Sequence, residues 1–318
     1  MKAALSLDLD NQWSYMKTHC DPGWESLPSY LDTVVPRALE VLDAIGVKIT
    51  WFIVGLDAAQ PRNQPALASI SAAGHEIGNH SYYHEPWLHR RTPAEIEDEI
   101  ALAEQSILAA TGKQTRGFRG PGFVRSAEIY RILARRGYAY DASTLPTFIG
   151  PLARAYYFRS AKLDAQARRD RQDLFGSFGD GFERNRPHFV ETPDGKLAEV
   201  PVTTMPGLRV PIHISYLLYL ARISPAAALG YFRTALGLCR LSRTKPSILL
   251  HPLDFLDGTD CDALRFFPAM DMAAGVKLKV TAGAIRMLAD SFEVGPVIDF
   301  VEARKPSDDV LPAYASGE

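Results

Sequence analysis

Two histidines stand four residues apart in the stretch HSYYH, as His80 and His84. On a helical turn, side chains at this spacing point the same way, so the two imidazoles could bind one metal ion. One carboxylate would complete a three-ligand site and leave positions open for water and substrate. The H-x-x-x-H spacing also arises by chance, so a metal site depends on what the fold adds to the pair.

A pair of aspartates closes the first apolar run, in the stretch SLDLDN (6–11). Because side chains alternate along an extended strand, Asp8 and Asp10 are expected to face the same side. Asp10 is the candidate third ligand, and Asp8 is then free to take a proton from metal-bound water. The simpler alternative is that both aspartates only cap the turn at the end of the strand.

Three more reactive side chains stand at or near the ends of later β-rich runs: Arg119, Asp141 and His251. Arg119 near Asp8 would keep that aspartate ionised, and a protonated His251 could donate to a leaving amine. Asp141 is a candidate hydrogen-bond partner for an imidazole. Alternatively, the arginine lies over the sheet surface and the histidine is only packed. Because the carboxyl ends of parallel strands share one face, we expect these groups to meet in one pocket.

Short β-rich runs alternate with helical patterns along the chain. The expected strands span residues 3–8, 47–55, 75–79, 115–119, 138–143, 197–203 and 246–251. The clearest helix spans 93–111, where Thr92 and Glu95 form a capping box and Gly112 ends the pattern. Further helices are expected near 213–222, 225–241 and 281–292. Such repetition predicts an α/β fold with a parallel sheet, and seven strands favour an incomplete barrel.

A single domain is expected over residues 1–318, with its core between about 3 and 295, because no linker or repeat interrupts the pattern. The chain is 47% hydrophobic, which is enough to fill a sizeable core. Residues 150–195 break the rhythm with charged, glycine-containing sequence, which predicts an insertion over one face.

Composition argues against several classes of protein. A net charge of −2, with acids and bases interspersed, does not suit a nucleic-acid partner. The three cysteines, Cys20, Cys239 and Cys261, are widely spaced, which favours free thiols in a reducing compartment. Asp8 interrupts the apolar start MKAALSLDLD and leaves no room for a signal peptide, so a cytoplasmic location is expected.

Five stretches, in this order, resemble the polysaccharide deacetylase family, also called carbohydrate esterase family four. They are SLDLDN (6–11), HSYYH (80–84), RGFRGPGF (116–123), YDAST (140–144) and LLHP (249–252). The resemblance covers most of the chain from residue 3 to about 255, and the ordered set is more specific than any one motif. It implies a metal-dependent hydrolase built on a distorted seven-stranded (β/α) barrel.

The resemblance also implies a metal centre and its base. Asp8 would be the general base, while Asp10, His80 and His84 would bind zinc or a similar divalent ion, with cobalt, nickel, manganese and iron as alternatives. The family usually has two adjacent aspartates, whereas Leu9 separates them here. Which aspartate binds the metal and which acts as the base therefore stays open.

The remaining motifs imply groups around that centre. By resemblance, Arg119 would orient the base, His251 would be the general acid and Asp141 would hold that histidine. The backbone N–H of Gly122, after Pro121, would help to stabilise the oxyanion. The family's usual aromatic residue in the R-x-P motif is replaced here by Gly122, so we expect the pocket wall to differ.

The implied reaction is hydrolysis of an N-acyl amide, which releases acetate and a free amine. The expected location favours an amino sugar that is small or carried on a nucleotide, lipid or natural product, rather than bulk wall polymer. Trp13 and Trp24, in the aromatic loop 10–30, either stack on a sugar ring or pack the loop, and Asp254 is a candidate pocket residue. The stretch 211–241 is either a membrane-surface contact or a buried helix pair.

Three other functions compete with deacetylation. The same site could open a cyclic amide or ureide. Two histidines and one carboxylate also form the facial triad of non-haem iron oxygenases, although such a centre has no evident need for Asp8, Arg119 and His251. The third alternative is a barrel that binds without cutting. The pattern predicts no oligomeric state.

Overall fold

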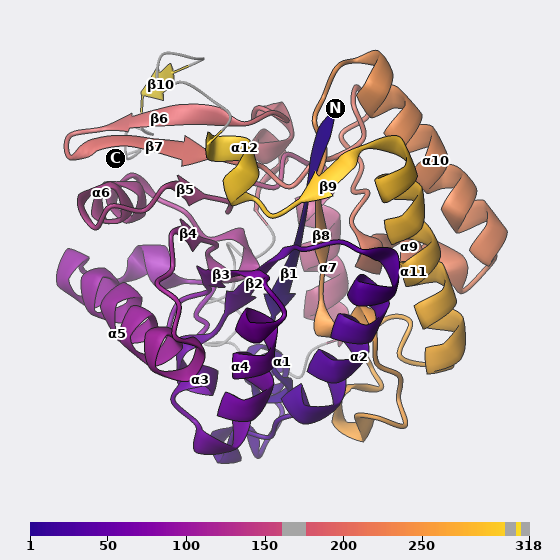
Figure 1. Cartoon of the computed structure of the whole chain (residues 1–318), viewed down its shortest axis with the longest axis horizontal. Coiled ribbons are helices and arrows are strands. Elements are labelled where there is room, and N and C mark those ends of the chain that lie inside the picture. Colours follow the sequence, from indigo (N-terminus) through magenta and orange to yellow (C-terminus); the bar gives the residue numbers. More distant parts are fainter. Residues whose placement is uncertain (161–175, 303–309, 313–318) are drawn as a thin grey trace.

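The computed structural model describes residues 1–160, 176–302 and 310–312, in which helices surround a central sheet (Figure 1). The strands are β1 (Lys2–Leu9), β2 (Thr50–Ile53), β3 (Glu76–Asn79), β4 (Gly117–Phe118), β5 (Tyr140–Asp141), β6 (His188–Thr192), β7 (Gly195–Glu199), β8 (Ser247–Leu250), β9 (Glu293–Gly295) and β10 (Val310–Pro312). The helices are α1 (Gln12–His19), α2 (Leu31–Ile45), α3 (Gly55–Ala58), α4 (Gln64–Ala72), α5 (Pro93–Thr111), α6 (Ala127–Arg135), α7 (Gly150–Ser160), α9 (Ile214–Ala221), α10 (Pro225–Leu241), α11 (Ala274–Ser291) and α12 (Ile298–Glu302).

The strands form a ring. β7, β5, β4, β3, β2, β1 and β8 are neighbours in this order, and each adjacent pair runs parallel. Beyond β7 the chain reaches β8, where the Thr203 amide donates to the Ser247 carbonyl at 2.8 Å. The Ser247 amide in turn donates to the Thr203 hydroxyl at 2.8 Å. The predicted fold class, a distorted seven-stranded (β/α) barrel, is confirmed.

Alternating residues of β1 serve two separate cores. Leu5 and Leu7 pack outward into a hydrophobic cluster that also contains residues of the surrounding helices. Ala4 points to the other side of the strand, where it joins Phe52 and Tyr140 in an inner cluster. This period of two is the property of an extended strand that also carries Asp8 to the inner face of the barrel.

Several predicted helices are confirmed, among them 93–111, which is α5 with its complete capping box at Thr92. The last predicted helix begins earlier than expected, since α11 already starts at Ala274 rather than near 281. Lys277 breaks the apolar pattern of the first turn in the sequence. In the structure it is fully buried, and its ammonium donates to two backbone carbonyls. A buried lysine resembles a surface residue in sequence until its hydrogen-bond partners are known.

The predicted insertion departs from the βα rhythm as expected. It begins with α7 and ends in an antiparallel hairpin of β6 and β7, a pairing that the pattern did not predict. Residues 161–175, which belong to the predicted insertion, lie outside the described residues. The assignment of the whole chain to one domain stays a prediction.

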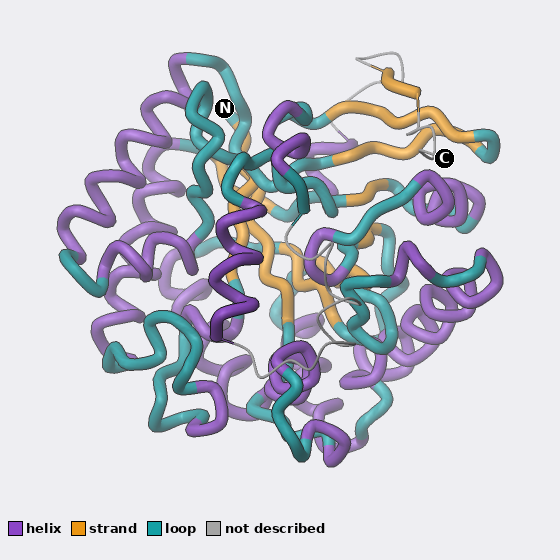
Figure 2. The backbone as a smooth tube through the Cα atoms, turned by 180° about the vertical axis from the view of Figure 1, so that it is seen from behind, coloured by secondary structure: helices purple, strands orange, loops and turns teal. Residues whose placement is uncertain are grey.

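The apolar stretch 211–241 forms α9 and α10, which pack on each other and on α11. The backbone tube in Figure 2 shows these helices wrapped around the strands together with the other helices. Leu217 and Phe232 are fully buried in the main hydrophobic cluster, so a buried helix pair accounts for the apolar pattern. Among the described residues, no helix combines the length and the apolar character needed to cross a bilayer. Contact with a membrane surface stays a prediction without structural support.

Candidate active site

The strand register brings the predicted reactive residues to one end of the barrel. Leu7 of β1 lies opposite Leu250 of β8, so the next residues, Asp8 and His251, follow at the same level. In the same way, the amide of Arg119 donates to the Asn79 carbonyl at 3.0 Å, which places Arg119 beside the loop that follows β3. The carboxyl ends of the strands therefore meet here, as the βα repetition predicts.

Asp10, His80 and His84 form a compact set of metal-binding groups. One oxygen of Asp10, Oδ1, lies 3.1 Å from His80 Nε2 and 2.9 Å from His84 Nε2. The candidate ligand atoms of the three residues all lie within 4.8 Å of one another. His80 Nδ1 lies 2.7 Å from the Arg119 carbonyl, which can only accept, so this nitrogen carries the proton and Nε2 keeps its lone pair. The donor set of two imidazoles and one carboxylate fits a divalent ion of the zinc type.

The histidine pair does not stand on a helical turn, and this part of the prediction is wrong. Residues 80–84 form a loop in which Ser81 and His84 have φ angles of 61° and 52°. Asn79 Oδ1 accepts from the Ser81 amide at 2.8 Å, and the Ser81 hydroxyl accepts from the His84 amide at 3.2 Å. These side-chain hydrogen bonds fold the loop back on itself, so the imidazoles meet through a tight turn rather than through helical spacing.

Charges inside this set stabilise one another. Burial opposes ionisation of Asp10, but His84 and His80 outweigh it and hold the pKa of Asp10 well below its usual range. Burial also works against the imidazolium of His80, but its hydrogen bond to Asp10 outweighs this effect and raises the pKa of His80. The pocket thus favours a positive charge beside Asp10, which is the condition that a bound cation would meet.

Asp8 belongs to a separate, buried ion pair. Arg119 is fully buried, and its Nη1 lies 2.8 Å from Asp8 Oδ1 and 3.0 Å from the Ser6 hydroxyl. Arg119 Nε donates to the Ala142 carbonyl at 2.8 Å, and its guanidinium carbon lies 4.5 Å from the ring centre of Phe52. The guanidinium is therefore fixed on several sides and sets the orientation of the Asp8 carboxylate.

The structure does not pair Asp141 with His251, so this predicted contact is wrong. Asp141 accepts hydrogen bonds from the amide and the hydroxyl of Ser143, and the Ser143 hydroxyl accepts from the Gly120 amide at 2.8 Å. Opposite Asp141 stands Glu199, the last residue of β7. Burial raises the pKa of Asp141, while burial and the neighbouring Asp141 raise the pKa of Glu199 well above its usual value. Through Ser143, Asp141 supports the loop that carries Arg119 and Gly120.

His251 has a different set of partners. Its Nδ1 lies 2.9 Å from the Ser215 hydroxyl, which lies 2.7 Å from Asp254 Oδ1. Asp254 also accepts from the backbone amide of His251 at 2.8 Å. Asp254 was predicted to line the pocket, but it is only 1% exposed and lies behind Ser215. That prediction is corrected, because burial and these hydrogen bonds leave it no room to contact a substrate.

The loop after β4 presents the predicted oxyanion donor. Pro121 is buried and Gly122 is exposed, with a φ of 59° that favours glycine. A Cβ atom at position 122 would lie 2.9 Å from Pro86 Cβ, which gives a steric reason for the missing aromatic residue. Among the described residues, no backbone carbonyl accepts from the Gly122 amide, so this N–H remains available to a substrate oxygen.

The predicted aromatic loop 10–30 contains α1, and its aromatic residues have different roles. Trp13 is fully buried and donates to Asp57 Oδ1 at 2.9 Å, so the prediction that it stacks on a sugar is wrong. Trp24 is half-buried, with Lys17 Nζ 5.4 Å from the centre of its ring, and its stacking role stays a prediction. Burial, followed by the charges of Asp10, Tyr30, Asp254 and Asp8, raises the pKa of Tyr15 well above the usual value.

Sequence reasoning missed two functional candidates, Ser215 and Glu199. Glu199 ends β7 but lies inside the predicted strand 197–203, so the rule that selected the other strand-end residues did not select it. Ser215 gives no such signal, because it stands in the first turn of α9 and reaches His251 only through helix packing. The prediction of free thiols holds, since Cys20, Cys239 and Cys261 form no disulfide.

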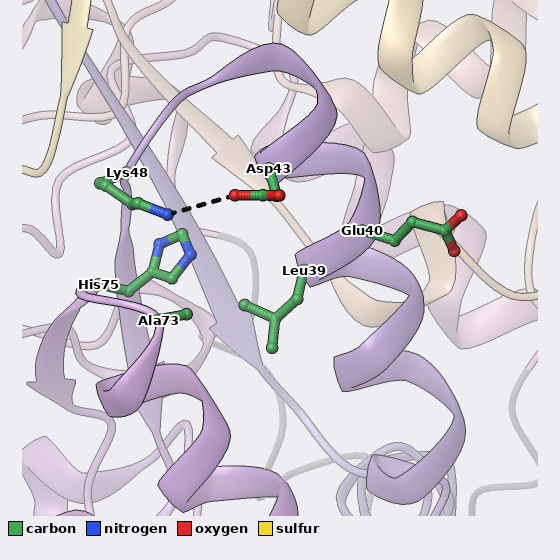
Figure 3. Close-up of a pocket in the computed structure, with 6 residues that line it drawn as sticks. All are labelled: Leu39, Glu40, Asp43, Lys48, Ala73 and His75. Carbon is green, nitrogen blue, oxygen red and sulfur yellow. Dashed lines mark ion pairs between the residues drawn. The ribbon is translucent and has the colours of Figure 1, made fainter.

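A hollow of about 280 Å³ lies at the opposite end of the barrel from this site. Figure 3 shows its lining residues, with the Lys48 ammonium facing Asp43 and the ring of His75, and with Glu40 turned away. Lys48 and His75 precede β2 and β3, so this hollow belongs to the amino ends of the strands.

Comparison with known proteins tests the predicted resemblance. The family model described as polysaccharide deacetylase matches residues 20–140, a region that contains His80, His84 and Arg119. This match supports the predicted resemblance over residues 20–140. Asp8, Asp10 and His251 lie outside the matched region, so their connection to the site comes from the structure.

Individual relatives agree with the family match over part of their length. A peptidoglycan deacetylase-like protein of Gibberella zeae is 35% identical over 131 residues, which are 40% of this chain and 36% of that protein. A chitooligosaccharide deacetylase of Bradyrhizobium sp. is 35% identical over 106 residues, which are 33% of this chain and 47% of that protein. The chain thus spans less than half the length of these two curated relatives.

The fold is shared with a crystal structure over the whole chain. This structure, of a protein from Mycobacterium smegmatis assigned as a polysaccharide deacetylase, covers 100% of this chain and 94% of its own chain, with a TM-score of 0.65. Its sequence identity of 20% restricts this likeness to the fold.

Proposed function

We propose that this protein is a metal-dependent hydrolase that removes an N-acyl group, most simply acetyl, from an amino sugar. The observation that carries the proposal is the placement of the Asp10, His80 and His84 set at the same barrel end as the Asp8–Arg119 pair. His251 follows the neighbouring strand at that end. The names of the relatives, a peptidoglycan deacetylase-like protein and a chitooligosaccharide deacetylase, support an acetylated amino sugar as the substrate class.

Asp10, His80 and His84 would hold the divalent ion, and the set suits zinc first. When bound, such an ion polarises the attacking water and the amide carbonyl. With three protein ligands, a bound ion would remain open to water and substrate.

The chain itself supplies the proton transfers. Asp8, held by Arg119 at 2.8 Å, takes a proton from the water as its oxygen attacks the acyl carbon. The Gly122 N–H donates to the oxyanion that develops on the carbonyl oxygen. His251 then gives a proton to the nitrogen, which keeps the electron pair of the breaking C–N bond and leaves as an amine.

The carrier of the amino sugar is the finer part of this proposal. We expect a small glycoside or one linked to a nucleotide, a lipid or a natural product, in line with the expected cytoplasmic location. The relatives' names add chitooligosaccharides and peptidoglycan fragments to the candidates.

The test is acetate release from a panel that covers all of these classes of N-acetylated sugar. Metal-loaded protein is compared with chelated protein and with the His84→Ala variant as the inactive control. We expect release from one class that disappears both on chelation and in the variant. Release that persists in His84→Ala would overturn the proposal, and opening of a cyclic ureide without acetate release would replace it with the rival hydrolysis.

A further inference from the structure

His251, Ser215 and Asp254 form a chain of hydrogen bonds, called the relay below, in which donors and acceptors are defined. Asp254 accepts at both carboxylate oxygens, from the His251 amide at 2.8 Å and from the Ser215 hydroxyl at 2.7 Å. Because the serine proton is directed to Asp254, the serine oxygen is left to accept from His251 Nδ1 at 2.9 Å. The imidazole therefore carries a proton on Nδ1 and is held through that nitrogen.

Helix α11 fixes the turn that carries Asp254. The fully buried Lys277 donates from Nζ to the carbonyls of Leu253 and Leu256, each at 2.7 Å. The Thr281 hydroxyl donates to the Asp254 carbonyl at 3.2 Å. Residues of α11 therefore hold the turn that carries Asp254, and α9 carries Ser215. The hydrogen bonds to His251 form where these two helices pack against the end of β8.

Other titratable groups near His251 are few among the described residues. His213, which caps α9, lies with its ring centre 6.3 Å from that of His251, and burial followed by the charge of His251 lowers the pKa of His213 to about 3. Lys277 acts electrostatically on Asp254, Asp8 lies in the neighbouring strand β1, and both Asp254 and Asp8 act electrostatically on Tyr15. Asp254 is therefore the acidic group that is hydrogen-bonded to the His251 backbone and linked to its ring.

We propose that Ser215 and Asp254 are positioning residues, which hold His251 by Nδ1 so that Nε2 delivers the proton to the leaving nitrogen. This inference rests on the proposed function, in which His251 is the general acid. The Ser215 hydroxyl links the ring to the buried carboxylate of Asp254, which fixes the orientation of the ring. A direct carboxylate partner, which Asp141 was predicted to provide, is replaced here by a serine-mediated one.

The kinetic test uses Ser215→Ala, Ser215→Thr and Asp254→Asn on the metal-loaded full chain. We expect kcat of Ser215→Ala to fall on the order of 10-fold to 100-fold, a part of the ~10²–10⁴-fold effect of a general acid, with KM nearly unchanged. Ser215→Thr keeps the hydroxyl that contacts His251 Nδ1 and should retain kcat. An unchanged kcat in Ser215→Ala would overturn the relay.

A second readout does not depend on activity. Nitrogen NMR of ¹⁵N-histidine-labelled protein reports the tautomer of each ring, and His251→Gln identifies the signal of His251 among the eight histidines. We expect neutral His251 to carry its proton on Nδ1, and this preference to weaken in Ser215→Ala and Asp254→Asn. A proton on Nε2 in the unmodified chain would refute the relay. Protein that shows the expected tautomer but hydrolyses no amide would refute the proposed function and leave the relay standing.

Discussion

The two ends of the barrel both place histidines beside charged residues, but they use the imidazole in opposite ways. At the carboxyl ends of the strands, His80 donates from Nδ1 to a backbone carbonyl, and its Nε2 lies 3.1 Å from Asp10 Oδ1. At the amino ends, His75 accepts at Nδ1 from the Ile49 amide at 3.1 Å, so the lone pair of that nitrogen is already used. A backbone carbonyl that accepts from Nδ1 leaves the lone pair of Nε2 free to bind a metal. A backbone amide that donates to Nδ1 occupies the lone pair of that nitrogen instead.

The pKa values of the histidines also differ between the two ends of the barrel. Burial and then the charge of Lys48 lower the pKa of His75 to about 4, so this ring stays neutral and structural. His80 is more deeply buried, which works against its imidazolium, but its hydrogen bond to Asp10 outweighs burial and raises its pKa, so positive charge is favoured there. Residue type alone therefore does not identify a metal site, because the same side chain becomes a ligand or a packing group according to its backbone partner and its nearest charge.

The largest expected effect comes from removing an imidazole at the carboxyl end. His84→Ala should lose metal and turnover together, with a fall in metal affinity larger than the ~10–100-fold typical of changes behind the ligands. Metal content after dialysis and turnover on the best substrate measure the two losses. A variant that kept full metal content would remove His84 from the ligand set.

A second variant tests whether Asp8 is the general base rather than a metal ligand. Asp8→Asn should keep its metal but lose on the order of 10²–10⁴-fold in kcat, because the proton acceptor is gone. It should also cost ~3–5 kcal/mol of unfolding free energy, since Arg119 would be left buried without its counter-charge. Metal analysis, steady-state kinetics and urea unfolding test these points, with Asp10→Asn as the matched control that should lose metal. The reverse pattern in the two variants would exchange the two aspartates' roles.

The amino end should respond through stability alone. His75→Phe leaves the Ile49 amide without its acceptor, so we expect a loss of ~1–3 kcal/mol in unfolding free energy with unchanged kcat and metal content. The folded pKa of His75, about 4, lies below the usual value of 6.5, so its contribution is complete above pH 6.5 and is lost as pH falls toward 4. Urea titrations at several pH values measure this, and His75→Phe should lack that part of the acid sensitivity. A loss of activity in this variant would break the division between the two ends.

The smallest expected effect concerns the charge beside His75. Lys48 lies 3.8 Å from Asp43 in a half-exposed ion pair, so Lys48→Gln should change the unfolding free energy by less than ~1 kcal/mol. Because Lys48 lowers the pKa of His75, its removal should move that pKa upward, toward the usual value. A proton NMR titration of the His75 ring measures the shift, and a downward shift would mean that Lys48 does not act on this ring.

Much of the barrel was predictable because its strands follow local rules. Each of the seven predicted runs overlaps a strand of the ring, and the reactive residues near their ends lie at one barrel end because parallel strands share a direction. The pairing of Asp10 with the two histidines followed from this arrangement, although the helical turn assumed for His80 and His84 proved to be a loop. The strand β6 escaped notice because its hairpin lies within charged, irregular sequence.

Other assignments depended on contacts that no spacing reveals. Trp13 was a plausible sugar platform until Asp57 was found as its buried acceptor. The sequence predicts Asp254 near the pocket, but only the structure shows its hydrogen bond with Ser215. The predicted partner of Asp141 is His251, whereas Asp141 accepts from Ser143. In each case the sequence suggests one partner for a side chain and the structure shows another. Packing decides which partner the side chain reaches.

By itself, the sequence determined the alternation of strands and helices, the family motifs and the set of residues that reach one end of the barrel. These depend on side-chain period and chain direction, which are local properties. Only the tertiary structure decided which nitrogen of His80 is free, which acid stands behind His251, and why His75 is no ligand. Those outcomes depend on hydrogen bonds between segments far apart in the chain, and such bonds exist only once the helices have packed on the barrel.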